Sequence, residues 1–151
     1  MDVVSERSSG ARAASVLHVR CPAGLPEPVY RQVLELLRGV TPVVQAIPPG
    51  AALLELRGAF RYQGTDDVGR IAAVVRLRAL ALLGVDLRIG AGRSWAVAAT
   101  ASAQVPEPGG VLSVWAEDTR AFLAPLPVAA LHGIGPRQAQ ALTAYGVHTV
   151  G

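Results

Sequence analysis

The spacing of apolar and polar positions predicts two amphipathic helices in the first half of the chain. In residues 28–38, apolar side chains recur at helical spacing and form one face, made of Val29, Val33, Leu36 and Leu37. Gly39 ends this helix. A second run, from about 66 to 83, has an inward stripe of Val68, Ile71, Ala72, Val75, Ala79 and Leu82. Gly84 ends that helix, and Thr65 or Asp66 is expected to cap its start.

Short apolar runs between turn residues predict the strands. They lie at about 15–20, 43–47, 51–57 and 85–91, and Pro48-Pro49-Gly50 is strong turn chemistry between two of them. The order of elements through Ala91 is therefore β-α-β-β-α-β. This is the ferredoxin-like α+β arrangement, in which an antiparallel sheet carries two helices on one face. The pattern continues with an extra helix (94–104), an extra strand (111–115), a short helix (117–124) and small helices over 125–151.

Composition narrows the function classes. The chain has 151 residues and a formal charge of +3, and all 14 basic residues are arginine. This excess of positive charge is compatible with nucleic-acid binding but does not by itself indicate it. Cys21 is the single cysteine, which fits a reducing cytoplasm, and the three scattered histidines offer no metal-ligand cluster. No apolar run reaches the roughly 18–20 residues of a membrane span, so we expect no membrane association. We also expect no cofactor.

Several strings in order along residues 15–151 resemble the Y family of translesion DNA polymerases. Leu17-His18-Val19 resembles the opening strand of the family's palm, and further palm-like strings follow at 30–42, 52–58, 89–92 and 97–102. The strings at 122–128 and 131–151 resemble the start of the thumb. The resemblance implies a ferredoxin-like palm over 15–118 and a partial thumb with a helix–hairpin–helix element over 119–151. Residues 1–14 are expected to be a disordered lead-in.

The departures from the family pattern concern the metal site. The resemblance implies two metal ions held by carboxylates, which are the hard oxygen ligands that Mg²⁺ prefers. Arg20 stands where the first strand should close on a carboxylate, and Pro22 stands at a second acidic position. Gly50 and Ala51 stand where the remaining Asp and Glu belong. We therefore expect no bound metal and no enzymatic activity.

Other parts that the resemblance implies are also replaced. Residues 21–27 bridge the place of the fingers, which we expect to be absent. Gly24-Leu25 replace an aromatic pair, and Ala99 and Trp95 stand where two lysines belong. Trp95 is therefore a candidate contact for a protein partner.

The acidic pairs Asp66-Asp67 and Glu117-Asp118 do not restore a metal site. Both fall at predicted helix starts, where carboxylates cap amides and suit the helix dipole. Glu55 alternates with Leu54 and Leu56, so we expect it on the opposite face of the sheet from them. Capping is therefore the interpretation we adopt for the two pairs.

The string 131–142 is a candidate helix–hairpin–helix for DNA binding. Gly133, Ile134 and Gly135 allow a tight turn whose amides can approach a phosphate at the start of a helix, and Arg137 adds positive charge. We interpret this as sequence-independent contact with the DNA backbone, and the alternative is a purely structural turn.

Arginines elsewhere give a weaker signal. Arg93, at a Gly-rich turn before a helix, is a further candidate for holding a phosphate. The cluster of Arg70, Arg76 and Arg78 is typical of a solvated helix face.

The leading hypothesis from the sequence is a non-catalytic Y-family homologue acting in DNA repair or translesion synthesis. It would bind DNA weakly and without sequence preference, dock a repair or mutasome protein, or do both. One alternative is a protein-interaction module, a mutasome-type scaffold without DNA contact. The other is a degenerate, truncated polymerase remnant.

Overall fold

The computed structural model of the chain describes residues 15–60, 64–65, 67–131 and 136–151. The expected lead-in at 1–14, the candidate cap Asp66 and the candidate turn at 133–135 lie outside these residues.

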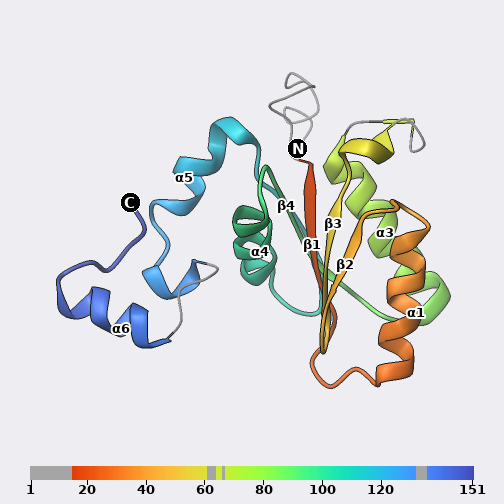
Figure 1. Ribbon diagram of the computed structural model, residues 1–151, viewed down its shortest axis with the longest axis horizontal. Coiled ribbons are helices and arrows are strands. Elements are labelled where there is room, and N and C mark those ends of the chain that lie inside the picture. The colour runs from red at the N-terminus through yellow and green to blue at the C-terminus, as the bar shows by residue number, and fades with distance from the viewer. Residues whose placement is uncertain (1–14, 61–63, 66, 132–135) are drawn as a thin grey trace.

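A five-stranded sheet with the order β2-β3-β1-β4-β5 forms the centre of the fold (Figure 1). The strands are β1 (Val16–Arg20), β2 (Val44–Ile47), β3 (Ala51–Glu55), β4 (Arg88–Gly92) and β5 (Gly110–Ser113). β1 pairs antiparallel with both β3 and β4, and β5 joins β4 in parallel. The first four strands have the ferredoxin-like order, so the fold-class prediction is confirmed, with β5 as the added strand.

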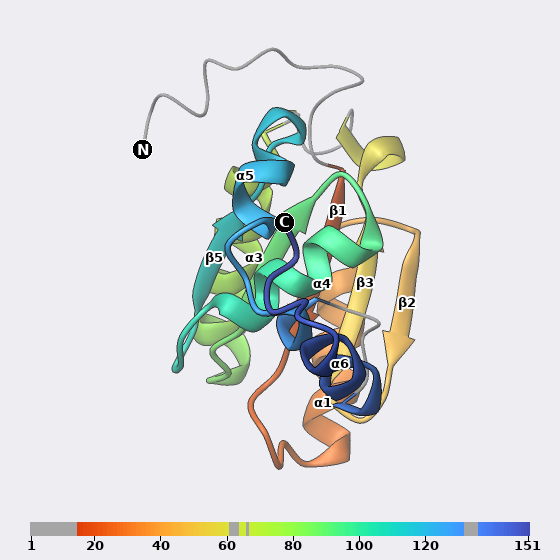
Figure 2. The same ribbon diagram turned by 90° about the vertical axis from the view of Figure 1, so that its left-hand side faces the viewer.

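The helices divide between the two faces of the sheet. α1 (Glu27–Arg38) and α3 (Val68–Leu83) cover one face, and α4 (Trp95–Gln104) covers the other (Figure 1). α5 (Thr119–Leu123) and α6 (Pro136–Ala144) lie on the α4 side, as Figure 2 shows. Short 3₁₀ helices occur at η3 (Arg57–Ala59), η4 (Ala116–Asp118) and η5 (Val128–Ala130). Within the described residues, none of the helices is both long and apolar enough to cross a membrane.

The main core lies between the sheet and the α1–α3 pair. Leu17, Leu54 and Ile89, from three neighbouring strands, are fully buried there. Asp67 caps α3, because its side chain accepts a hydrogen bond from the backbone N–H of Arg70 at 3.2 Å. The cap therefore lies one residue after the expected Asp66. Gly84 ends the helix in the left-handed conformation with φ 69°.

One position of the predicted α3 stripe is wrong. Leu82 is 72% exposed, whereas Leu83 packs against the core. Each residue advances a helix by about 100°, so positions 82 and 83 flank the centre of the stripe on opposite sides. Tertiary neighbours decide between them, and here they favour Leu83.

α4 packs closely on β4 because β4 presents glycines toward it. A Cβ atom at Gly90 would fall on the carbonyl oxygen of Ala98 and the amide nitrogen of Ser102. A Cβ atom at Gly92 would press on Val97. The small side chains of Ala98 and Ala101, both fully buried, complete this contact.

An ion pair links α3 to the start of β4. Arg76 donates from Nε and Nη2 to the two carboxylate oxygens of Asp86, at 2.7 and 3.0 Å. The backbone N–H of Leu87 donates to the same carboxylate at 2.9 Å. The hydrogen bonds from Arg76 lower the pKa of Asp86 below its ordinary value.

We predict that Gly90→Ala destabilises the fold by about 3 kcal/mol, because the new methyl group meets backbone atoms that cannot move aside cheaply. Gly58→Ala is the matched control, since a Cβ atom there has nothing within 4 Å. Urea unfolding of both variants measures the difference. Equal unfolding midpoints for the two variants would show that the packing of α4 on β4 does not require glycine at position 90.

We predict that Asp86→Asn lowers the free energy of unfolding by about 1–2 kcal/mol at neutral pH, the lower range reflecting the partial exposure of Arg76. Because the pKa of Asp86 is lowered in the fold, its contribution is present above roughly pH 4 and is lost as pH falls through the lowered value. Variant and wild type should therefore converge in acid. Glu35→Gln, which breaks an exposed pair with Arg38, should change stability by less than about 0.5 kcal/mol.

Candidate nucleic-acid interface

The first candidate region is the end of the sheet where β1 stops and β2 turns into β3. Arg20 is the register partner of Ala51, and the backbone N–H of Cys21 donates to the carbonyl oxygen of Gly50 at 2.8 Å. The structure thus brings together Arg20, Gly50 and Ala51, the residues at the implied metal-ligand positions.

The residues at this end of the sheet do not fit a divalent cation. A guanidinium carries only donors and a positive charge, and Gly50 and Ala51 have no ligating atoms in their side chains. Among the described residues there is also no group of three or more His, Cys, Asp or Glu side chains placed to hold a metal ion.

Arg20 instead binds the last turns of α4. Its Nε donates to Ser102 Oγ at 2.8 Å, and its Nη2 donates to the carbonyl oxygen of Ala99 at 3.2 Å. The buried Ser102 hydroxyl also donates to Ala99, and it lies 2.9 Å from Nδ1 of the buried His18. A cation near the C-terminal end of a helix is favoured by the helix dipole, so Arg20 stabilises the position of α4.

Arg88 does the same from the neighbouring strand. It is the register partner of Arg20, and it donates to the carbonyl oxygens of Val105 at 2.7 Å and Ala103 at 3.0 Å. Burial, and then the charge of Arg88, lower the pKa of Arg20 from its ordinary value. Two like charges therefore lie side by side at this end of the sheet.

A pocket of about 300 Å³ opens beside the two guanidinium groups. Its lining comes from the end of β1, the β2–β3 turn, β4 and the loop after α4, and it includes Arg20, Cys21, Gly50, Ala51, Arg88 and Glu107. Burial raises the pKa of the Cys21 thiol to about 11, so the thiol is neutral at physiological pH.

The second candidate region contains Arg93. This exposed residue precedes Ser94, the cap of α4, whose hydroxyl accepts from the backbone N–H of Val97 at 3.3 Å. Arg93 shares a pocket of about 620 Å³ with Arg120, which lies on α5. The structure therefore adds a second exposed arginine to the residue that the sequence singled out.

The third candidate region is the segment around α6. Gly133, Ile134 and Gly135 lie outside the described residues, and Arg137 is exposed in the first turn of α6. After α6 the chain returns to η5, where the backbone N–H of Val128 donates to the carbonyl oxygen of His148 at 3.1 Å.

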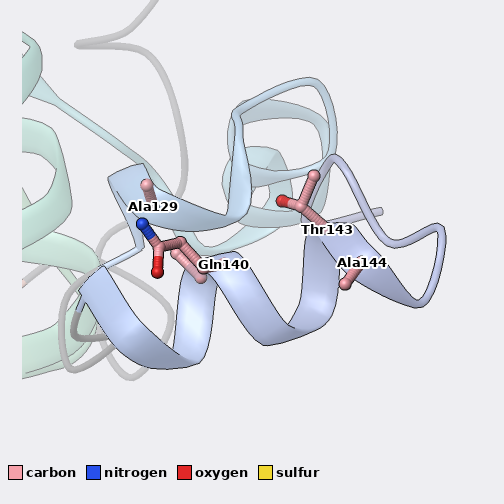
Figure 3. Close-up of a pocket in the computed structure, with 5 residues that line it drawn as sticks. Ala129, Gln140, Thr143 and Ala144 are labelled. Atoms are coloured by element: carbon pink, nitrogen blue, oxygen red, sulfur yellow. The ribbon is translucent and has the colours of Figure 1, made fainter.

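A pocket of about 560 Å³ lies between η5 and α6, and Gln140 extends across it toward Ala129 (Figure 3). It is lined by Ala129, Ala139, Gln140, Thr143 and Ala144. None of these five side chains is titratable near neutral pH, so none of them is a candidate for acid–base chemistry.

Other residues singled out by the sequence have structural surroundings. Glu55 accepts from the backbone N–H of Arg57 at 2.8 Å, while Leu54 and Leu56 are fully buried, as expected from their alternation. Arg76 pairs with Asp86, whereas Arg70 and Arg78 are exposed. Trp115 is buried, and Trp95 is 43% exposed.

Sequence reasoning missed Arg88, Arg120 and Ser102. Arg88 is two residues before Gly90 and therefore lies on the α4 face of β4, but no local signal in the sequence indicates that it binds carbonyl groups at the end of α4. Arg120 and Ser102 carry no local signal, because their importance comes from residues far away in the sequence.

Comparisons with known proteins agree on one family. The IMS family HHH motif matches residues 116–147. The chain is 32% identical over 155 residues to DNA polymerase IV of Desulfatibacillum aliphaticivorans, covering 95% of this chain and 38% of that protein. It is 33% identical over 125 residues to DNA polymerase IV of Halobacterium salinarum, covering 83% of this chain and 29% of that protein. The chain therefore spans about a third of the length of these relatives.

Solved structures support the same fold. The fold resembles a DinB family error-prone DNA polymerase from Sulfolobus solfataricus, with a TM-score of 0.73 and 13% identity over 89% of this chain and 57% of that one. It also resembles an insertion ternary complex of Dbh DNA polymerase, with a TM-score of 0.71 and 17% identity over 82% of this chain and 35% of that one.

The relatives correct one expectation from the sequence. The replaced carboxylates at Arg20, Gly50 and Ala51 led us to expect that the chain is not an enzyme. Its relatives are named DNA polymerase IV, which is an enzyme, so that expectation is wrong. Arg20, Gly50 and Ala51 determine which side-chain groups are available at this end of the sheet. Their identities do not establish that the chain lacks enzymatic activity.

We predict that Cys21 reacts slowly with iodoacetamide at pH 8 in the folded chain. Raising the thiol pKa from 9.0 to about 11 lowers the thiolate fraction, so alkylation should be roughly a hundredfold slower than in urea-unfolded chain. Mass spectrometry of the alkylated fraction over time measures both rates. Similar rates in the two states would contradict the burial of this thiol.

Proposed function

We propose that this chain, which belongs to the Y family of DNA polymerases, binds DNA through its phosphate backbone and acts in DNA repair or translesion synthesis. The binding is weak and independent of sequence, because it depends on phosphate contacts. Such a role places the protein in the cytoplasm with its DNA.

The observation that carries the proposal is the gathering of exposed arginines on one side of the sheet. Arg93 precedes α4, Arg120 lies on α5 and Arg137 lies in the first turn of α6. Figure 2 shows α4, α5 and α6 together on the face turned to the viewer. Arginine suits phosphate recognition because its planar group can donate two parallel hydrogen bonds.

A small apolar cluster supports the relative placement of α4 and α5. Val97 and Ala101 of α4 pack with Val114, and Leu112, Phe122 and Leu123 lie against them. We propose that 15–118 forms a palm-like unit and 119–151 a thumb-like unit, and that this cluster joins the two. Near this cluster, Arg93 and Arg120 line one pocket.

We predict that Arg137→Ala weakens binding to DNA severalfold and lowers the slope of log affinity against log salt by about one. The combined Arg93→Ala, Arg120→Ala and Arg137→Ala variant should lose most of the affinity. Fluorescence anisotropy with single-stranded and primed DNA, over a range of salt concentrations, measures both effects.

The matched control is Arg78→Ala, which removes the same charge from an exposed position on α3, across the sheet. It should leave the affinity nearly unchanged. If Arg78→Ala weakens binding as much as Arg137→Ala, net charge rather than this surface accounts for the affinity.

A second candidate function is docking to a repair or mutasome protein. The observation in its favour is the outer face of α3, where Val74, Leu77 and Leu80 are 38%, 65% and 39% exposed. An apolar helix face of this kind is typical of a protein contact. If the wild-type chain shows no saturable binding to single-stranded or primed DNA at low salt, the DNA-binding proposal is rejected and this second function becomes the preferred one.

A further inference from the structure

The pocket beside Arg20 and Arg88 has a charge opposite to the one its place in the fold would suggest. The family resemblance implies carboxylates there, yet the lining contains two guanidinium groups and one carboxylate, that of Glu107. Glu107 is exposed, and among the described residues no carboxylate forms an ion pair with Arg20 or Arg88. With the Cys21 thiol neutral, the lining carries an excess of positive charge.

Both guanidinium groups are held in place while keeping unused donors. Each uses Nε and Nη2 for hydrogen bonds to α4 or the residue after it, at 2.7–3.2 Å. Nη1 of each forms no hydrogen bond within the described part of the chain. Side chains already fixed in this way lose little conformational entropy when they bind a ligand.

The size of the pocket limits what can enter. A volume of about 300 Å³ lies at the low end of small-molecule sites. It suits a compact anion whose oxygens can accept from two neighbouring guanidinium groups at once. A phosphate group, free or at the end of a larger molecule, has this shape and charge.

We propose that the Arg20–Arg88 pocket is a binding site for a phosphate group, which it holds through the two arginines without a metal ion. The site is separate from the DNA surface proposed above, because it uses none of Arg93, Arg120 and Arg137. Either proposal can therefore fail while the other stands.

Cys21 provides a direct readout, since it lines the pocket and is the only cysteine in the chain. The rate of its alkylation by iodoacetamide is measured at pH 9.5, in EDTA and at constant ionic strength, with increasing inorganic phosphate. Bound phosphate covers the thiol and disfavours the thiolate, so the rate should fall in a saturable way. Chloride at the same ionic strength should leave the rate unchanged.

Two further arms identify the source of the phosphate. One uses a deoxynucleoside triphosphate in EDTA, and the other compares an oligonucleotide bearing a 5′-phosphate with the same oligonucleotide bearing a 5′-hydroxyl. The arm with the lowest half-saturating concentration identifies the ligand. If neither inorganic phosphate nor any of these molecules gives saturable protection, the proposal is overturned.

Variants test the residues. Arg88→Gln should raise the half-saturating concentration roughly tenfold or more, because it removes a charged donor. Arg78→Gln, the same change outside the pocket, should not alter it. Glu107→Gln should lower it by removing the opposing charge, and this variant leaves the α4 contacts intact should Arg88→Gln fail to fold. Protection unchanged in a folded Arg88→Gln variant, or weakened in Glu107→Gln, overturns the proposal.

Discussion

The contact between α4 and the sheet is the constraint on which the rest of the structure depends. Gly90 and Gly92 leave no side chain between β4 and the helix, while Arg20 and Arg88 bind carbonyl groups at its C-terminal end. Because α4 connects β4 to β5, its position also sets where β5 joins the sheet and where the chain leaves toward α5. Both the charged pocket and the arginine-bearing surface are therefore consequences of how closely this helix lies on the strands.

Local signals were sufficient to predict most of the fold. The Pro48-Pro49-Gly50 turn, the glycines that end α1 and α3, and the alternation of Leu54, Glu55 and Leu56 all act within a few residues of chain. The end of α3 was different, because Leu82 and Leu83 satisfy the helical stripe about equally well. Only the tertiary neighbours of that last turn select Leu83, and no periodicity in the sequence contains them.

The candidate site was predictable only in part, for the same reason. The resemblance placed Arg20, Gly50 and Ala51 at the implied metal-ligand positions, and the strand register brings these residues together. What Arg20 touches could not be predicted, since its bond to Ser102 joins residues 82 positions apart. The pairing of Arg93 with Arg120 likewise depends on how α5 packs on α4, which involves a cluster of side chains from four elements or their connections.

The absence of lysine from the chain takes on a physical meaning at this end of the sheet. A lysine ammonium is a compact point charge, whereas a guanidinium spreads five N–H donors over a rigid plane. Arg20 and Arg88 each use two of these directions to hold α4, and both still line a pocket that carries excess positive charge. A lysine at either position could not reach two acceptors of the helix with a fixed geometry and keep its charge at the pocket. Arginine at these two positions therefore allows one side chain both to fix the helix and to charge the pocket beside it.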